Sequence, residues 1–371
     1  MQMFVANDCR QAVLAVDALH QKNYTCPGCG QRVILRKGEV RIAHFAHLSG
    51  HGCHVFSEGE TQIHLSGKQR VFDWCRQNHL AVKLEAYLPK LKQRPDILVY
   101  WHHHWTAIEF QCSPISFERL CERTRGYHSQ GYKVWWILGP TYLKKRLTLE
   151  QVSKFSYFQK KLHLFMSFYN PKRDEFLVRH HLHQDLFGKL NWQVYRFVPS
   201  KMKFDQLFLG HLPVPKKENK DRYQEALELQ RRLLGRYCDS RLSQIQRLCY
   251  VHHLNLAGCP WLIHDSFFAL PTGVASPLEI KIYFLIQLRA NYKKKLPYQT
   301  FSRWFEQANQ NATLIFPNIR NSRICTEMNV KLLVNYLATE KWITCEAAGY
   351  RINQQPDWYS DLSEKLRHFC A

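Results

Sequence analysis

Three polar residues interrupt two otherwise apolar stretches of the chain. Asp96 directly precedes the apolar run 97–99, and Glu109 and Gln111 alternate with apolar residues. Because successive side chains of a β-strand point to opposite faces, Glu109 and Gln111 share one face. Converging carboxylates repel each other unless a cation lies between them, and oxygen ligands of this kind suit Mg²⁺ or Mn²⁺. A metal held by Asp96 and Glu109, with Gln111 orienting water or adding a ligand, predicts phosphodiester hydrolysis.

The strands that must position these residues are expected at 94–101 and 105–112. If the numbers of paired residues sum to an odd value such as 205, Asp96 lies opposite Glu109 and on its face. An even sum would place Asp96 on the core side, and a bulge near Pro95 would re-aim it. The alternative to a metal site is a pair of surface acids on a solvated strand face.

A helix is expected before the strands, beginning near Ser57 with Glu60 at the capping-box spacing. Glu60, His64 and Lys68 are four residues apart and would form one stripe of that helix. Glu60 could add a carboxylate, while His64 or Lys68 could contact a phosphate or shuttle a proton. An exposed, salt-bridged stripe is the alternative interpretation.

A second helix is expected over 116–129, followed by a buried strand over 133–138. Arg123 and Tyr127 are one turn apart on that helix and could contact the phosphate that flanks the cut. Arg94, beside the first strand, is a further candidate for DNA contact. A solvated helix face with one tucked ring is the alternative for Arg123 and Tyr127.

A Cys/His-rich segment precedes the first helix. Cys26 and Cys29 stand in a Pro-Gly-Cys-Gly turn, a common geometry for zinc thiolates. We expect His47 and Cys53 to complete a structural zinc site, with His44 as the rival ligand, and a metal-free turn as the alternative.

A second cysteine group has poorer spacing. Cys259 and His264, with Cys249 or Cys238 nearby, could be proposed as a metal site. We interpret this group as buried packing.

The composition is that of a globular protein with an unusual charge. Lys and Arg total 52 against 30 acidic residues among 371, which gives a formal net charge of +22 and favours a nucleic acid as partner. A ribosome- or membrane-surface protein is the alternative. The N-terminal segment 1–20 lacks the apolar core of a secretory signal, and no apolar run is long enough to cross a bilayer. We therefore expect a cytoplasmic protein without membrane insertion, whose 13 cysteines are thiols or metal ligands.

The fold class expected is α/β, with a small N-terminal Cys/His zinc-ribbon-like module, a restriction-endonuclease-like α/β core and a mainly helical C-terminal region. Beyond Thr141 the sequence is basic and mainly helical in pattern, and 221–250 is expected to form one long amphipathic helix. The predicted regions are a Cys/His zinc-binding-like module at 1–55, a nuclease-like core at 56–145, a basic extension and linker at 146–215, and a helical domain at 216–371.

Pro95-Asp96 followed by Glu109-x-Gln111, between two helices, resembles the PD-(D/E)XK nuclease superfamily. The neighbouring motifs are more specific: Cys26-Pro-Gly-Cys29-Gly, His44-Phe-Ala-His47, Ser57-Glu-Gly-Glu60-Thr, Arg94-Pro-Asp96, Ala107-Ile-Glu-Phe-Gln-Cys112-Ser113 and Trp136-Ile-Leu-Gly139. Together they resemble the competence protein CoiA family across at least residues 1–140.

The resemblance implies a protein of naturally transformable bacteria that acts on incoming DNA during recombination. It carries over Glu60, Asp96, Glu109 and Gln111 as the active site. The superfamily usually has lysine where this chain has Gln111, and glutamine offers only dipoles. Lys68 could supply the missing charge, or the enzyme could be slow or inactive.

The function predicted is therefore a divalent-metal-dependent DNA nuclease that acts on incoming, single-stranded or branched DNA, with Mg or Mn at its active site and a structural Zn. One alternative is a nuclease fold kept as a DNA-binding platform. Another is an adaptor that recruits recombination proteins.

Overall fold

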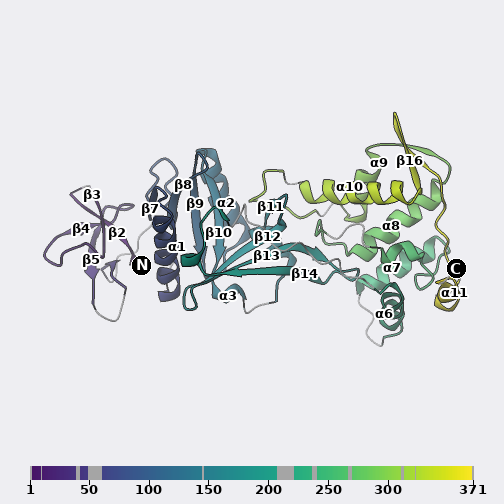
Figure 1. Cartoon of the computed structure of the whole chain (residues 1–371), viewed down its shortest axis with the longest axis horizontal. Coiled ribbons are helices and arrows are strands. Elements are labelled where there is room, and N and C mark those ends of the chain that lie inside the picture. Colours follow the sequence, from purple (N-terminus) through teal and green to yellow (C-terminus); the bar gives the residue numbers. More distant parts are fainter. Residues whose placement is uncertain are drawn as a thin grey trace. The chain divides into compact units, whose positions relative to one another are not determined.

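The structure is a computed structural model that describes residues 2–9, 11–38, 42–48, 61–143, 146–206, 221–235, 240–265, 270–310, 313–321 and 323–369. The chain forms two compact units (Figure 1). Unit 1 comprises Met1–His180, Gln193–Pro213 and Phe316–Arg320, and unit 2 comprises His181–Trp192, Val214–Ile315 and Asn321–Ala371.

Unit 1 begins with a small six-stranded sheet in the order β1-β6-β5-β4-β2-β3. Its strands are β1 (Gln2–Met3), β2 (Val5–Asp8), β3 (Gln11–Leu14), β4 (Tyr24–Thr25), β5 (Arg32–Arg36) and β6 (His44–His47). The apolar core beneath it is small and includes Met3, Tyr24, Val33 and Phe45. A core of this size is typical of a module that needs an additional stabilising element, such as a metal.

The main sheet of unit 1 has eight strands, with the order β14-β13-β12-β10-β9-β8-β7 and β11 paired to β12. The strands are β7 (Val82–Leu84), β8 (Ile97–Trp101), β9 (His104–Gln111), β10 (Lys133–Leu138), β11 (Tyr157–Gln159), β12 (His163–Asn170), β13 (Glu175–Gln184) and β14 (Leu190–Phe197). Strand β9 is parallel to β10 and antiparallel to β8.

The predicted register is confirmed: Ile97 pairs with Ile108 and Leu98 with Ala107, so paired numbers sum to 205.

Two helices cover opposite faces of this sheet. Helix α1 (Gln62–Gln77) approaches β9 so closely that a Cβ added at Gly67 would lie 1.9 Å from Cε1 of Phe110. Helix α2 (Phe117–Ser129) contacts the preceding residue, Glu109, whose side chain points to the other face. Each face of β9 is therefore closed by one helix, which explains why the strand is buried from Thr106 to Gln111.

The start of α1 differs from the prediction. Thr61 is its N-cap, since the Thr61 hydroxyl accepts a hydrogen bond from the His64 amide at 3.3 Å. The helix thus begins later than the expected start near Ser57, and Ser57 and Glu60 lie outside the described residues.

The mainly helical pattern expected beyond Thr141 is wrong for residues 157–197. Four strands, β11 to β14, occupy this stretch and extend the main sheet beyond β10. Consecutive residues of β12 and β13 are buried on both faces of the sheet, among them Phe168 and Phe176, so tertiary burial decides the secondary structure here. The short helices of unit 1 are α3 (Pro140–Leu143), α4 (Leu149–Phe155) and the 3₁₀ turn η1 (Pro199–Lys201).

Unit 2 is mainly helical, as predicted. Its elements are α6 (Arg222–Leu234), α7 (Ser240–Val251), the 3₁₀ turn η2 (Trp261–His264), α8 (Pro277–Ala290), α9 (Thr300–Ala308), α10 (Ile324–Thr339), α11 (Leu362–Arg367) and a three-stranded sheet of β15 (Lys295–Pro297), β16 (Ile343–Glu346) and β17 (Gly349–Ile352). Two helices, α6 and α7, replace the single helix expected over 221–250. Within the described ranges, no helix has the length and apolar character needed to span a bilayer.

Candidate active site and metal module

Asp96 lies in a bend just before β8, and its carboxylate has three described partners. Its Oδ2 is 3.1 Å from Nε2 of His64 and accepts the backbone N–H of Phe110 at 2.8 Å, while its Oδ1 is 3.5 Å from Nζ of Lys68. Burial alone would raise the pKa of Asp96, but His64 and Lys68 hold it well below its usual range. Asp96 is therefore an anion.

The position of Asp96 corrects one detail of the prediction. A strand N–H points along the plane of the sheet, so an acceptor of the Phe110 N–H lies in that plane and not on a face. Although the register is the expected one, Asp96 is in a bend and is not governed by the strand alternation. Its carboxylate lies beyond the end of β8 and contacts His64 and Lys68 of α1.

Glu109 contacts the helix on the other face. Its Oε1 is 2.5 Å from NH2 of Arg123 and accepts a hydrogen bond from the Tyr127 hydroxyl. Burial raises the pKa of Glu109 to about 7; Arg123 opposes this rise, and the charge of Asp96 adds to it. Because both described contacts use Oε1, Oε2 is left for another ligand.

Gln111 shares the face of Glu109, as the strand alternation requires. Its side-chain nitrogen donates to the carbonyl of Ser113 at 2.8 Å, which leaves its Oε1 for another partner. Gln111 is buried, with 6% of its surface exposed.

A buried carboxylate that the sequence interpretation missed lies behind the site. Glu85 contacts Nζ of Lys68 at 2.5 Å and NH1 of Arg94 at 3.2 Å, and it accepts the backbone N–H groups of Phe4 at 2.8 Å and Val5 at 3.3 Å. Burial would raise the pKa of Glu85, but Arg94 and Lys68 lower it. The N-terminal sheet is thus bonded to the carboxylate that holds Lys68. The only signal in the sequence is a lone acidic residue in an apolar stretch.

The predicted site residues are thus distributed over two groups. His64 and Lys68 contact Asp96, and Arg123 and Tyr127 contact Glu109. Arg94 is buried against Glu85, and Tyr127 has no exposed surface, so a direct DNA contact by either stays a prediction. Glu60 lies outside the described residues.

The predicted zinc module brings three donors together. One ligand atom each from Cys26, Cys29 and His47 lies within 4.8 Å of the others, and Sγ of Cys29 is 3.3 Å from Nε2 of His47. Burial lowers the pKa of His47, which favours the neutral imidazole that binds metals. The cluster could hold a metal such as zinc.

The turn that holds the two thiols requires glycine. The Gly30 amide donates to the Cys26 carbonyl at 2.9 Å, and Gly30 has a φ of +72°.

The sequence offered two further zinc-ligand candidates, His44 and Cys53. His44 does not join the cluster among the described residues; its Nδ1 contacts the carbonyl of Ile42 at 2.8 Å. Cys53 lies outside the described residues.

The cysteine group of unit 2 is a packed interior. Cys259 and Cys249 are buried, and Lys365 lies 3.5 Å from Sγ of Cys259 and 2.8 Å from Nε2 of His264. No metal cluster is found there within the described part of the chain, and Cys238 lies outside it.

The domain consists of a helix, three antiparallel strands, a second helix and a parallel strand, with acidic residues just before β8 and on β9. This is the arrangement of a nuclease-like domain, and the Cys/His module precedes it in the chain. Two family models match: "Competence protein CoiA, N-terminal domain" at residues 8–56 and "Competence protein CoiA, nuclease-like domain" at residues 60–211. The chain belongs to the competence protein CoiA family, which the motifs predicted.

A curated relative supports the same family. Competence protein CoiA of Bacillus subtilis (strain 168) is 29% identical over 167 residues, which cover 44% of this chain and 45% of that protein. The match therefore spans less than half the length of the relative. No solved structure matches the chain.

Proposed function

We propose that the nuclease-like domain is a divalent-metal-dependent DNA nuclease that acts on incoming or branched DNA during competence and recombination. The observation that carries the proposal is the placement of two buried carboxylates at one point of β9: Asp96 accepts the backbone N–H of Phe110, the residue next to Glu109, at 2.8 Å. The negative charge of Asp96 accordingly adds to the rise in the pKa of Glu109. Two carboxylates that interact in this way attract a cation. The net charge of +22 supports a polyanionic substrate.

The donors of the site fit Mg²⁺ or Mn²⁺. Asp96 is anionic, Oε2 of Glu109 and Oε1 of Gln111 have no described partner, and all three are hard oxygen ligands. A bound metal would activate water and stabilise the charge that develops on the phosphoryl oxygens.

The chain's own residues have separable roles. His64 is partly exposed and 3.1 Å from Asp96, so it is the side chain placed to take or give a proton at Nε2. Lys68 has no exposed surface; its charge acts through Asp96 by keeping that carboxylate ionised. Arg123 and Tyr127 hold Oε1 of Glu109, which orients Oε2. Lys68, Arg123 and Tyr127 are thus proposed as positioning residues.

Two features favour a second function. Arg123 lies 2.5 Å from Glu109, so a guanidinium competes with a metal for this carboxylate, and the usual lysine is replaced by Gln111. A nuclease fold that binds DNA without cutting it, and that serves as a platform for recombination proteins, would tolerate both features.

The test is cleavage of single-stranded, duplex and branched DNA by the full chain with Mg²⁺ or Mn²⁺, beside Asp96→Asn and Glu109→Gln. We expect each substitution to lower the rate at least about a hundredfold. Glu122→Gln, on the exposed surface of α2, is the matched control and should leave the rate unchanged. Unchanged cleavage in both site variants would overturn the assignment. Binding of DNA without cleavage of any substrate would support the platform.

A further inference from the structure

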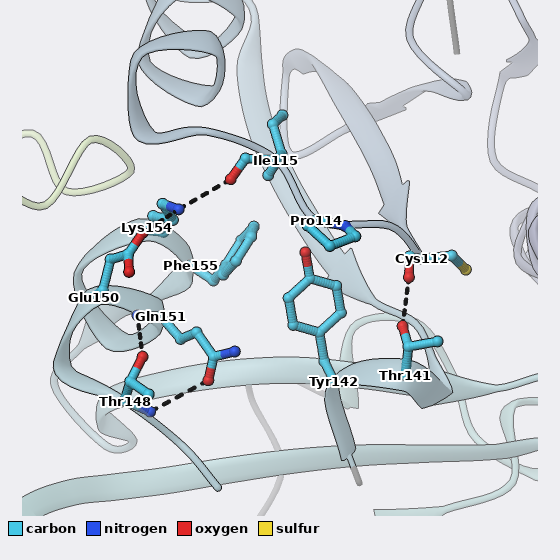
Figure 2. Close-up of a pocket in the computed structure, with 10 residues that line it drawn as sticks. All are labelled: Cys112, Pro114, Ile115, Thr141, Tyr142, Thr148, Glu150, Gln151, Lys154 and Phe155. Atoms are coloured by element: carbon cyan, nitrogen blue, oxygen red, sulfur yellow. Dashed lines mark hydrogen bonds and ion pairs between the residues drawn. The ribbon is translucent and has the colours of Figure 1, made fainter. Parts of the chain in front are cut away.

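A cavity of about 520 Å³ lies beyond the point where β9 and β10 end side by side (Figure 2). Gln111 and Leu138, the last residues of the two strands, are paired, and the cavity wall begins at the next residue, Cys112. Ligand pockets commonly measure about 300–1,000 Å³, and in α/β sheets they lie outside the carboxyl ends of the strands. The cavity therefore adjoins the candidate active site.

Side chains fix the wall through its backbone carbonyls. The Tyr142 hydroxyl and the side-chain nitrogen of Gln111 both donate to the Ser113 carbonyl, at 2.7 and 2.8 Å. Lys154 donates to the Ile115 carbonyl at 2.9 Å. One carbonyl thus connects Gln111 of the candidate active site with Tyr142 of the cavity, and the loop between them is held in place before any ligand arrives.

Two rings and an amide give the cavity its chemistry. Tyr142 and Phe155 are 5.4 Å apart and inclined at 75°, so the Tyr142 ring does not stack face to face on Phe155. Oε1 of Gln151 accepts the Thr148 amide at 3.2 Å, and Figure 2 shows the Gln151 side-chain nitrogen on the side of Tyr142. The cavity thus combines an aromatic surface with a hydrogen-bond donor.

The charges of the wall argue against a phosphate as the occupant. Nζ of Lys154 lies 2.5 Å from Glu150 and is also bonded to the Ile115 carbonyl. Its charge is therefore already balanced. A flat, neutral ligand with hydrogen-bond acceptors fits this lining better than an anion.

We propose that the cavity takes one unpaired nucleobase of the DNA strand bound at Gln111. The inference rests on the proposed function, because DNA bound at Gln111 places a flanking nucleotide beside the wall that starts at Cys112. A base can enter such a pocket only when it has left the duplex, so the site selects single-stranded or locally unpaired DNA.

The test compares the affinity of the full chain for two DNA strands of about 12 nucleotides. This length is within the site sizes of proteins that bind single strands. One strand carries its bases and the other has the same phosphates but abasic sugars. Binding is measured by fluorescence anisotropy without added Mg²⁺ or Mn²⁺, so that cleavage does not intervene. Tyr142→Ala should weaken binding of the base-carrying strand about fivefold or more, the loss of one stacked base, and leave the abasic strand unaffected.

Tyr142→Phe is the matched control, because it keeps the ring and removes the bond to Ser113. Because the ring stays, Tyr142→Phe should lose clearly less affinity for the base-carrying strand than Tyr142→Ala, and it should bind the abasic strand like the parent chain. Gln151→Glu keeps the acceptor for Thr148, removes the donor and adds a charge that repels the phosphates of both strands, so it should weaken the base-carrying strand more than the abasic strand.

Three results would overturn the proposal: Tyr142→Ala with no effect, Tyr142→Ala with equal loss on both strands, or Tyr142→Phe as damaging as Tyr142→Ala. Absence of cleavage with the base-specific loss intact would instead reject the nuclease and keep the pocket.

Discussion

Glu85→Gln should destabilise unit 1, because it leaves two buried cations without the carboxylate that they share. Lys68 and Arg94 contact different oxygens of Glu85, and neither the glutamate nor the lysine side chain has exposed surface. Glutamine has nearly the same shape, so packing is retained and the lost charge is what the substitution measures.

The expected magnitude follows from this burial. Removing one partner of a buried ion pair costs about 3–5 kcal/mol. In the variant, Lys68 still has the Asp96 carboxylate at 3.5 Å. The expected loss of stability is therefore about 3 kcal/mol, at the lower end of this range. For a unit of about 200 residues this corresponds to a Tm lowered by roughly 6–12 °C.

The assay is calorimetric unfolding of the full chain. Glu122→Gln is the control, since Glu122 forms an exposed pair with Arg119 and should change stability by less than about 1 kcal/mol. The folded-state pKa of Glu85 is lowered, so its contribution is complete above the ordinary carboxyl pKa and is lost as the pH falls through the lower folded value. The difference between Glu85→Gln and the parent should therefore shrink only in acid. Equal unfolding temperatures for the two variants at neutral pH would refute the reasoning.

The remaining predictions concern three other parts of the chain. Cys26→Ser should abolish zinc binding, measured as metal content by mass spectrometry; zinc retained in full by the variant would reject the module. Burial lowers the pKa of His264 to about 4, so unit 2 should lose about 3 kcal/mol as the pH falls from 6.5 to 4, and His264→Gln should remove this loss in unfolding titrations. Gly67→Ala should cost about 1–3 kcal/mol through overlap with Phe110, and the double variant with Phe110→Leu should regain part of it; a single variant as stable as the parent would disprove the close contact.

Local patterns were sufficient for the strands around the candidate site. The alternation of apolar residues and the short connection between β8 and β9 predicted both strands, and their register is the one in which paired numbers sum to 205. The spacing of His64 and Lys68 likewise predicted that both would lie on one side of α1.

Long-range contacts were not predictable in this way. Glu85 is joined to Phe4 across 81 residues of sequence, and no local pattern encodes such a contact. The direction of the Asp96 side chain depends on a bend before β8 that the strand alternation does not describe. Strands β11 to β14 were read as helical because their apolar residues lack a clear alternation, and their burial within the sheet comes from the tertiary fold.

The division of unit 1 along the chain has a consequence for its synthesis. Asn318, in the segment Phe316–Arg320, donates to the Lys154 carbonyl at 2.7 Å, although residues 214–315 of unit 2 lie between the two in the sequence. Translation proceeds at roughly 5–20 residues per second. The hydrogen bond to the Lys154 carbonyl can therefore form only after most of unit 2 has left the ribosome. Unit 1 can begin to fold first, but its folding is complete only after residues 316–320, which follow most of unit 2 in the sequence, have been synthesised. A gene fragment that stops at residue 213 would therefore encode an incomplete unit 1.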